Sequence, residues 1–208
     1  MLAVFQPETY LNITLNKVTG SSIGLSGRQA AEHMAVNTVY QLELGISGGK
    51  TYSTNRLGIF NAETAMNKGE SFVYTPNFTN NIVGYMGDVP NPAEITLTDV
   101  SIGESTVYAN TTGVTGNMTG AVYLVRAGSY IQINTHPYQV AENVAWSSNS
   151  NVAIPVTRRL MEDTGSVTTF AVGNPSWTVK FAEANPYTIQ PHDRLQYSTQ
   201  SIKLIEVL

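Results

Sequence analysis

The chain has 208 residues, a formal net charge of -4 and no cysteine. Its 11 Lys and Arg residues are scattered, with Arg158-Arg159 as the only adjacent pair, so the sequence lacks the basic arm or stripe that neutralises nucleic-acid phosphates. The absence of cysteine excludes disulfides and thiolate metal sites. A chain of this length can bury a full core, and we expect one domain over residues 1–208 with no direct contact to nucleic acid.

The first residues, MLAVFQPETY, contain neither a basic segment nor an apolar run of about 7 to 15 residues, so we predict no signal peptide. The longest apolar runs in the chain are far shorter than the ~20 residues that span a bilayer. We therefore predict no transmembrane segment.

Alternation of apolar and polar residues is the main signal for secondary structure. It is clearest in residues 9–18 and 39–46, and it is typical of half-buried strands. Further short strands are predicted at 71–75, 82–86, 94–99, 105–109, 121–126, 130–135, 152–157, 167–172, 177–182 and 201–207. Because twelve short strands do not fit easily in one open sheet, we predict an all-β, two-sheet antiparallel sandwich.

Turn residues suggest how these strands are joined. The Ala-Gly-Ser segment at 127–129 predicts a hairpin between strands 121–126 and 130–135. One or two short connector helices are expected, at 27–36 after Ser26 as an N-cap and at 156–163. The expected sheet-facing core positions are Ile13, Leu15, Leu42, Leu44, Val122, Leu124, Ile131 and Ile133.

Histidines provide no clear metal site. The chain has three, His33, His136 and His192, and none has the close spacing to a second ligand that metal sites usually show. His136 lies six residues before Glu142, but the metal sites of cupins need a His-x-His pair, and Tyr138 occupies the second position. We therefore predict no metal and no other cofactor.

Catalytic motifs are also missing, so we predict that the protein is not an enzyme and has no catalytic residues. There is no G-x-S-x-G elbow for a hydrolytic serine. Glycoside hydrolysis needs two carboxylates in one cleft, and Glu43 and Glu94 lie in predicted strands. Each is better explained as a solvent-facing strand residue.

Four N-x-S/T sequons occur, at Asn12, Asn77, Asn110 and Asn117. With 18 Asn and 40 Ser plus Thr in the chain, roughly three to four such motifs are expected by chance. The count therefore leaves open whether any of the four carries a glycan.

Low charge favours self-association. Only 12% of the residues are charged, whereas a typical soluble domain has about a quarter. Asn, Thr, Ser, Gln and Tyr replace the missing charges, and burying these side chains in an interface costs less than burying Lys or Glu.

The series of strands from Tyr10 to Val207, with the loops at 45–58 and 110–120, resembles the single jelly-roll capsid proteins of icosahedral viruses. The absence of a basic N-terminal arm makes the coats of viruses with an internal membrane especially similar. This resemblance implies a jelly-roll sandwich that self-assembles, meets other virion proteins and can touch an internal viral membrane. It also implies synthesis in the host cytoplasm and a final location in the virion.

The expected function is thus that of a virion structural protein, a coat subunit of an icosahedral shell. Two alternatives remain open. One is a carbohydrate- or receptor-binding β-sandwich module of a spike, decoration or tail protein, with a clustered Tyr/Trp face that binds a glycan or receptor. The other is a hydrolase of lectin-like fold with two carboxylates in a cleft.

Overall fold

A computed structural model describes residues 8–17, 20–23, 29–32, 38–46, 60–61, 64–65, 67–76, 84–116, 119–182 and 201–208. The chain divides into two compact units, the first formed by residues 1–78 and 178–208 and the second by residues 79–177. Both are built from antiparallel strands, and the described residues contain no helix of seven or more residues. The all-β prediction is confirmed, and the single domain over 1–208 stays a prediction.

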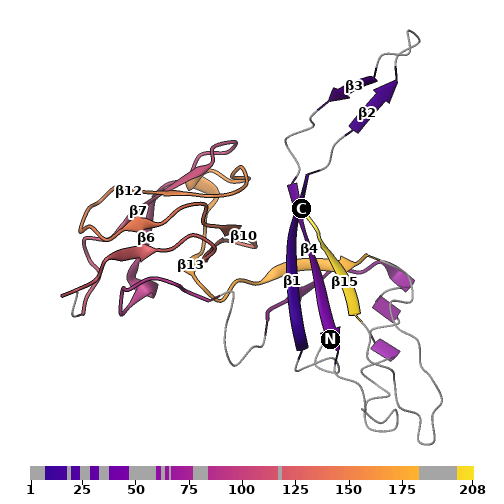
Figure 1. Cartoon of the computed structure of the whole chain (residues 1–208), viewed down its shortest axis with the longest axis horizontal. Helices are drawn as coiled ribbons and strands as arrows, with labels where there is room; N and C mark the ends of the chain where they lie inside the picture. Colours follow the sequence, from indigo (N-terminus) through magenta and orange to yellow (C-terminus); the bar gives the residue numbers. More distant parts are fainter. Residues whose placement is uncertain are drawn as a thin grey trace, which may run out of the picture. The chain divides into compact units, whose positions relative to one another are not determined.

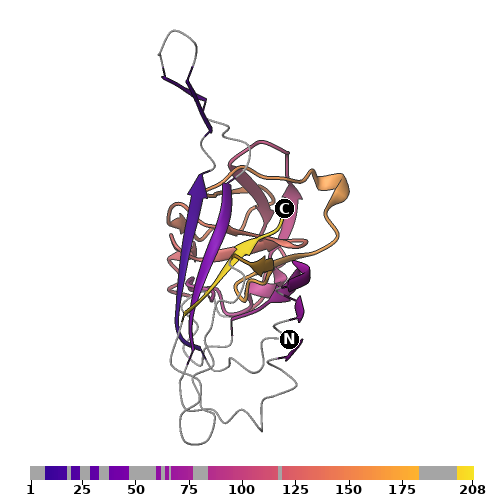
Figure 2. The ribbon, with the colours of Figure 1, turned by 90° about the vertical axis from the view of Figure 1, so that its right-hand side faces the viewer.

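Unit 1 is based on a five-stranded sheet (Figures 1 and 2). Its strand order is β1-β4-β15-β14-β5. The strands are β1 (Glu8–Lys17), β4 (Thr38–Ile46), β15 (Ser201–Glu206), β14 (Trp177–Phe181) and β5 (Phe72–Tyr74). A separate hairpin is formed by β2 (Gly20–Ile23) and β3 (Gln29–Glu32), which pair with each other.

Alternation sets the two faces of this sheet, as the sequence predicted. In β4, Tyr40, Leu42 and Leu44 are at most 1% exposed, whereas the residues between them are half-buried. Leu42 lies directly opposite Ile13 of β1 and Leu204 of β15, so the apolar residues form rows across the strands. Leu11, Ile13 and Leu15 of β1 are only half-buried, because β1 lies at the edge of the sheet.

Unit 2 contains three small antiparallel sheets, with the orders β12-β7-β6, β10-β9-β13 and β11-β8. Their strands are β6 (Thr96–Asp99), β7 (Thr106–Asn110), β8 (Tyr123–Val125), β9 (Tyr130–Ile133), β10 (His136–Gln139), β11 (Val144–Ala145), β12 (Val152–Pro155) and β13 (Phe170–Val172). Two 3-10 turns, η2 (Pro92–Glu94) and η3 (Thr164–Ser166), complete the unit. All three sheets contribute to one apolar core, which includes Val107, Leu124, Ile131, Ile133 and Ile154.

The predicted hairpin between 121–126 and 130–135 is wrong. β8 pairs with β11, and β9 pairs with β10 and β13. The true hairpin joins β9 to β10 through Asn134 and Thr135, and Asn134 has a left-handed backbone (φ 48°) that asparagine tolerates better than most residues. The sequence prediction extended the strand through this turn and so missed β10.

Four other local predictions differ from the structure. Residues 29–32 form a strand rather than part of a helix, and residues 156–163 form no helix. Residues 84–86, the described part of the predicted strand at 82–86, are not a strand. Glu94 lies in η2, so the strand predicted from Glu94 begins only at Thr96.

Tyr85 explains the irregular chain at 84–86. Its hydroxyl donates to the carbonyl of Leu124 at 2.5 Å and accepts the backbone N–H of Val89 at 3.1 Å, so the side chain joins the segment 85–89 to β8. A Cβ on Gly87 would lie 2.1 Å from this hydroxyl, and one on Gly173 would lie 2.8 Å from the Tyr85 nitrogen. Both positions therefore require glycine.

The sequence predicted Val122 and Leu124 as core residues, but only Leu124 is buried: Val122 is 57% exposed, just before β8 begins. Leu124→Ala should lower the free energy of unfolding by about 2 to 5 kcal/mol. Val122→Ala should change it by no more than about 0.5 kcal/mol. Chemical denaturation of the two variants measures both values, and a large loss for Val122→Ala would contradict the structure of this segment.

Candidate functional site

A groove of about 250 Å³ lies on the β6–β7 side of unit 2. Its lining consists of Asp99, Ser101, Glu104, Thr106 and Tyr108. Asp99 at the end of β6 is directly opposite Tyr108 of β7. Thr106 and Tyr108 share the outer face of β7 because the alternate residues, Val107 and Ala109, point into the core.

The groove brings together two carboxylates, two aliphatic hydroxyls and one phenol ring, with no basic residue in the lining. Carboxylates accept hydrogen bonds from ligand hydroxyls, and a half-buried tyrosine ring offers an apolar face with a polar tip. A general-acid carboxyl needs a sheltered, apolar setting, and both Asp99 and Glu104 are exposed. The groove therefore suits binding of a neutral polyhydroxylated ligand better than hydrolysis.

The segment 158–166 is hydrogen-bonded to the chain that forms the groove, at residues 99–104. Leu160 donates its backbone N–H to the carbonyl of Glu104 and accepts the N–H of Gly103, at 2.7 and 2.8 Å. The Thr164 hydroxyl donates to Asp99 at 3.2 Å and accepts the Val100 N–H at 2.7 Å. The position of the groove wall thus depends on what holds this segment.

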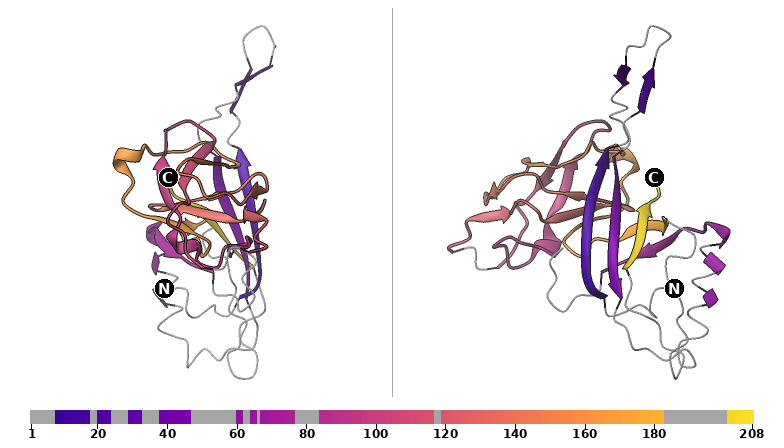
Figure 3. Two further views of the ribbon diagram at one scale, coloured as in Figure 1. Left: turned by 90° about the vertical axis from the view of Figure 1, so that its left-hand side faces the viewer. Right: turned by 45° about the vertical axis from the view of Figure 1, so that its right-hand side comes forward.

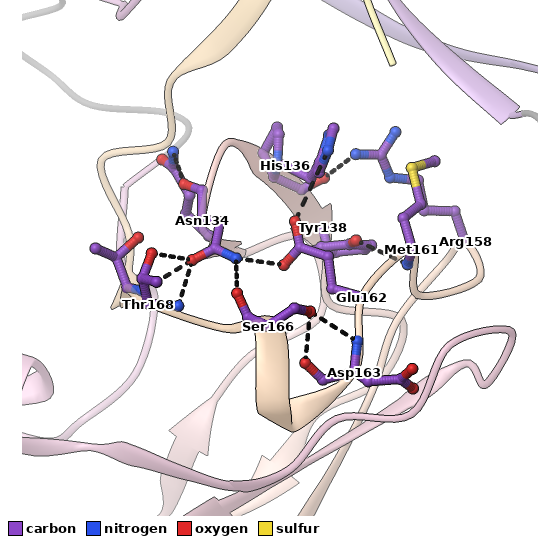
Figure 4. Close-up of polar contacts among 12 residues, drawn as sticks. Asn134, His136, Tyr138, Arg158, Met161, Glu162, Asp163, Ser166 and Thr168 are labelled. Carbon is purple, nitrogen blue, oxygen red and sulfur yellow. Dashed lines mark hydrogen bonds and ion pairs between the residues drawn. The ribbon is translucent and has the colours of Figure 1, made fainter.

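Asn134, at the β9–β10 turn, holds that segment on its other side (Figure 4). Its carboxamide oxygen accepts the backbone N–H groups of Thr168 and Thr169 and the Thr168 hydroxyl, at 2.7 to 2.9 Å. Its amide nitrogen donates to the Glu162 carboxylate at 3.1 Å and to the Ser166 carbonyl at 3.0 Å. Five hydrogen bonds from one side chain fix the segment to the turn.

Charged groups gather beside Asn134 (Figure 4). Nε2 of His136 lies 3.8 Å from the Glu162 carboxylate, and both side chains are largely buried, with 18% and 12% exposed. Arg158 is 2% exposed; it donates to the Pro137 carbonyl at 2.8 Å and its guanidinium lies 4.8 Å from the centre of the Tyr138 ring. The side chains of this cluster are therefore largely enclosed by the protein.

Burial raises the pKa of the Glu162 carboxyl above its usual range. The charge of His136, the hydrogen bond from Asn134 and the charge of Arg158 oppose this shift without cancelling it. Ionisation of Glu162 at neutral pH therefore slightly lowers the stability of the folded state.

The histidine predictions can be placed in part. His136 lies near Glu162 and not in a site with Glu142, which is exposed, and Tyr138 is a buried core residue. His33 and His192 lie outside the described residues. Within the described ranges, no three His, Asp or Glu side chains form a group that could hold a metal ion.

The two glutamates considered for glycoside hydrolysis belong to different units. Glu43 is on the polar face of β4 in unit 1, directly opposite Asn12 and Lys203. Glu94 in unit 2 accepts hydrogen bonds from the backbone and hydroxyl of Thr115, and the backbone bond is the main cause that lowers its pKa. Glu94 therefore anchors the loop that follows β7.

That loop, at 110–120, was expected to be irregular, and its described part is held in place. Asn91 donates to the Thr115 carbonyl at 3.1 Å, and the Asn110 side chain accepts the N–H and hydroxyl of Thr112 at 3.0 and 2.7 Å. Of the sequon asparagines, Asn12 is exposed on β1 and Asn110 is half-buried. Asn77, Asn117 and most of the loop at 45–58 lie outside the described residues.

No single sequence motif predicted either the groove or the Asn134 cluster. The groove residues lie around the β6–β7 connection, between Asp99 and Tyr108, and match no known motif, whereas the cluster joins residues up to 35 positions apart. The only local signal was the Asn-Thr pair between two apolar runs, which fits a two-residue hairpin turn.

No model of a known protein family matches the chain, and no curated protein matches it in sequence. Among the described residues, no helix is both long and apolar enough to cross a bilayer.

The raised pKa of Glu162 has a measurable consequence. The folded protein keeps the Glu162 proton to a higher pH than the unfolded chain does, so this stabilising contribution is full below the usual value of 4.5 and is lost as pH rises through the folded pKa. Glu162→Gln stays neutral and can still accept the Asn134 hydrogen bond. Its stability relative to the wild type should therefore increase between about pH 4 and pH 7.

Urea denaturation at both pH values measures this difference. Glu142→Gln, at an exposed glutamate, is the matched control and should show no such trend. A relative stability of Glu162→Gln that falls as pH rises would show that attraction to His136 and Arg158 outweighs the cost of burial.

Proposed function

We propose that the protein is a virion structural protein, a coat subunit of jelly-roll type that acts by symmetric assembly without catalysis or a cofactor. The observation that supports this most directly is the chemistry of the polar face of the unit 1 sheet. Tyr10, Asn12 and Thr14 are exposed there, and amide and hydroxyl groups outnumber charges. Such groups lose less on burial between subunits than Lys or Glu would.

The hydrogen bonds on this face agree with that reading. Asn16 donates to Gln41 at 2.7 Å and Tyr10 contacts Glu43 at 3.4 Å, so an amide pair and a phenol lie beside the directly opposite Glu43 and Lys203 on this face. In unit 2, three antiparallel sheets around one core are consistent with a β-sandwich. We propose that the partners are further copies of the chain and other virion proteins, within the virion.

Purified protein should form oligomers or sheets with individual interfaces on the order of 1,000 Å² or more. Because the contact groups are mainly uncharged, assembly should resist a change from low to high salt. Sedimentation velocity over a range of concentrations measures both properties. A strict monomer at high concentration in both salt conditions would contradict the proposal.

The groove in unit 2 favours a second candidate function, glycan or receptor binding by a virion surface module. Tyr108 supplies a ring, and Asp99 and Glu104 supply acceptors for sugar hydroxyls, in one concave site. This is the grouping of an aromatic residue with carboxylates that a lectin-like module needs.

Tyr108→Ala should weaken binding of a neutral oligosaccharide, selected from a glycan panel, at least ten-fold by calorimetry. Tyr123→Ala, at another half-buried tyrosine of unit 2 outside the groove, is the matched control and should bind as the wild type does. Absence of any saturable glycan binding, or equal binding by both variants, would remove this candidate.

A further inference from the structure

Strand β1 is the longest of the described strands and forms one edge of the unit 1 sheet (Figure 3, indigo strand). It has 10 residues and pairs with β4 on one side. No described strand pairs with its other side. An edge strand of this length presents a row of backbone N–H and C=O groups that another strand can pair with.

The other sheet edges carry the devices that usually prevent such pairing. β5, at the opposite edge of the same sheet, has 3 residues. In unit 2, the edge strands β10 and β12 contain Pro137 and Pro155, and β6 has an irregular register between Leu97 and Asp99. Short strands, prolines and bulges all block the addition of another strand.

β1 has none of these devices over most of its length. Its register with β4 is irregular between Glu8 and Leu11 and regular from Leu11 to Lys17. The segment 11–17 contains no proline, and lysine occurs only at its end. Its apolar residues Leu11, Ile13 and Leu15 are half-buried, so each keeps apolar surface that a neighbouring strand could cover.

Two antiparallel copies of β1 would also place residues of the same kind opposite each other. Residues directly opposite each other in an antiparallel pair lie on the same face of the sheet, so two copies of β1 keep their faces aligned only if odd positions meet odd positions. With Ile13 on the two-fold axis, apolar residues meet apolar residues and polar residues meet polar residues. The direct pairs are Ile13 with Ile13, Leu11 with Leu15, and Asn12 with Thr14 of the second copy.

We propose that β1 pairs antiparallel with β1 of a second copy of this chain, around a two-fold axis at Ile13. The pairing joins two five-stranded sheets into one continuous sheet and covers the half-buried row of β1. This inference rests on the proposed self-assembly and specifies one contact by which two copies associate. An isologous contact of this kind is the commonest form of subunit pairing.

A charge test addresses the proposed register. Asn12 and Thr14 are exposed, so replacing both should be tolerated by the fold of a single copy. In the variant Asn12→Lys/Thr14→Lys, lysines lie directly opposite each other on both sides of the axis, and like charges in that position destabilise a strand pair. The dissociation constant of the dimer should rise at least ten-fold, and less in 1 M salt.

The matched control is Asn12→Lys/Thr14→Glu, which changes the same two exposed positions but places lysine opposite glutamate. It should dimerise within about three-fold of the wild type, because opposite charges in direct cross-strand pairs are favourable. Circular dichroism of both variants checks that the strands are retained. Sedimentation velocity measures the dissociation constants.

Cross-linking gives an independent test, because the chain has no cysteine of its own. Ile13→Cys should be linked to a dimer by a short bismaleimide, since directly opposite Cβ atoms are about 5 Å apart. Val73→Cys, on the opposite edge strand β5 and 67% exposed before substitution, should not be. Efficient linking of Val73→Cys but not Ile13→Cys would overturn the pairing.

The outcomes separate this inference from the proposed function. If the wild type assembles and both double variants assemble equally well, or if both are monomeric, the β1 pairing is wrong and self-assembly stands. If the wild type is a strict monomer at high concentration, both are wrong. Loss of dimer in the first variant alone, with cross-linking at position 13, supports both.

Discussion

The side chain of Asn134 makes five hydrogen bonds that hold the irregular segment after β12 in unit 2. It sits at a two-residue turn, where its left-handed backbone lets β9 fold back onto β10. Its carboxamide then binds segments on both sides of η3, which in turn meet the groove wall at Asp99 and Glu104. The 158–169 segment contains no strand, and the Asn134 amide holds it together with the hydrogen bonds of Leu160 and Thr164.

The same residue shows how far the sequence could predict this fold. Period-two alternation identified most strands, because burial of one sheet face imposes that pattern whatever the partner strand is. It could not identify partners: β8 and β9 are adjacent in sequence but pair elsewhere. The groove and the Glu162 cluster were not predictable for a related reason, since contacts such as Thr164 with Asp99 depend on long-range pairing that leaves no local mark.

The few charged side chains occur in two kinds of environment. At the ion pair of Arg126 with Asp88, the carboxylate also accepts the backbone N–H groups of Val122 and Tyr123, so it fixes the start of β8. Where charges are buried, as at Arg158 and Glu162, each is hydrogen-bonded, Arg158 to the Pro137 carbonyl and Glu162 to the Asn134 amide. On the polar face of the unit 1 sheet, uncharged polar groups such as Asn12, Thr14 and Gln41 outnumber the charged ones.

The order of strands in unit 1 has a consequence for how the chain folds as it is made. β15, the last described strand, occupies the centre of the sheet between β4 and β14. The β1–β4 pair therefore cannot be completed until β15 has been synthesised. The hydrogen bond between Tyr40 and Glu206 joins residues 166 positions apart. Unit 2 is contiguous in sequence and can fold earlier on the ribosome, whereas closing unit 1 requires a long loop to be ordered first. Until then β4 exposes its own free edge, and the nascent chain at this stage is the one that chaperones would have most reason to bind.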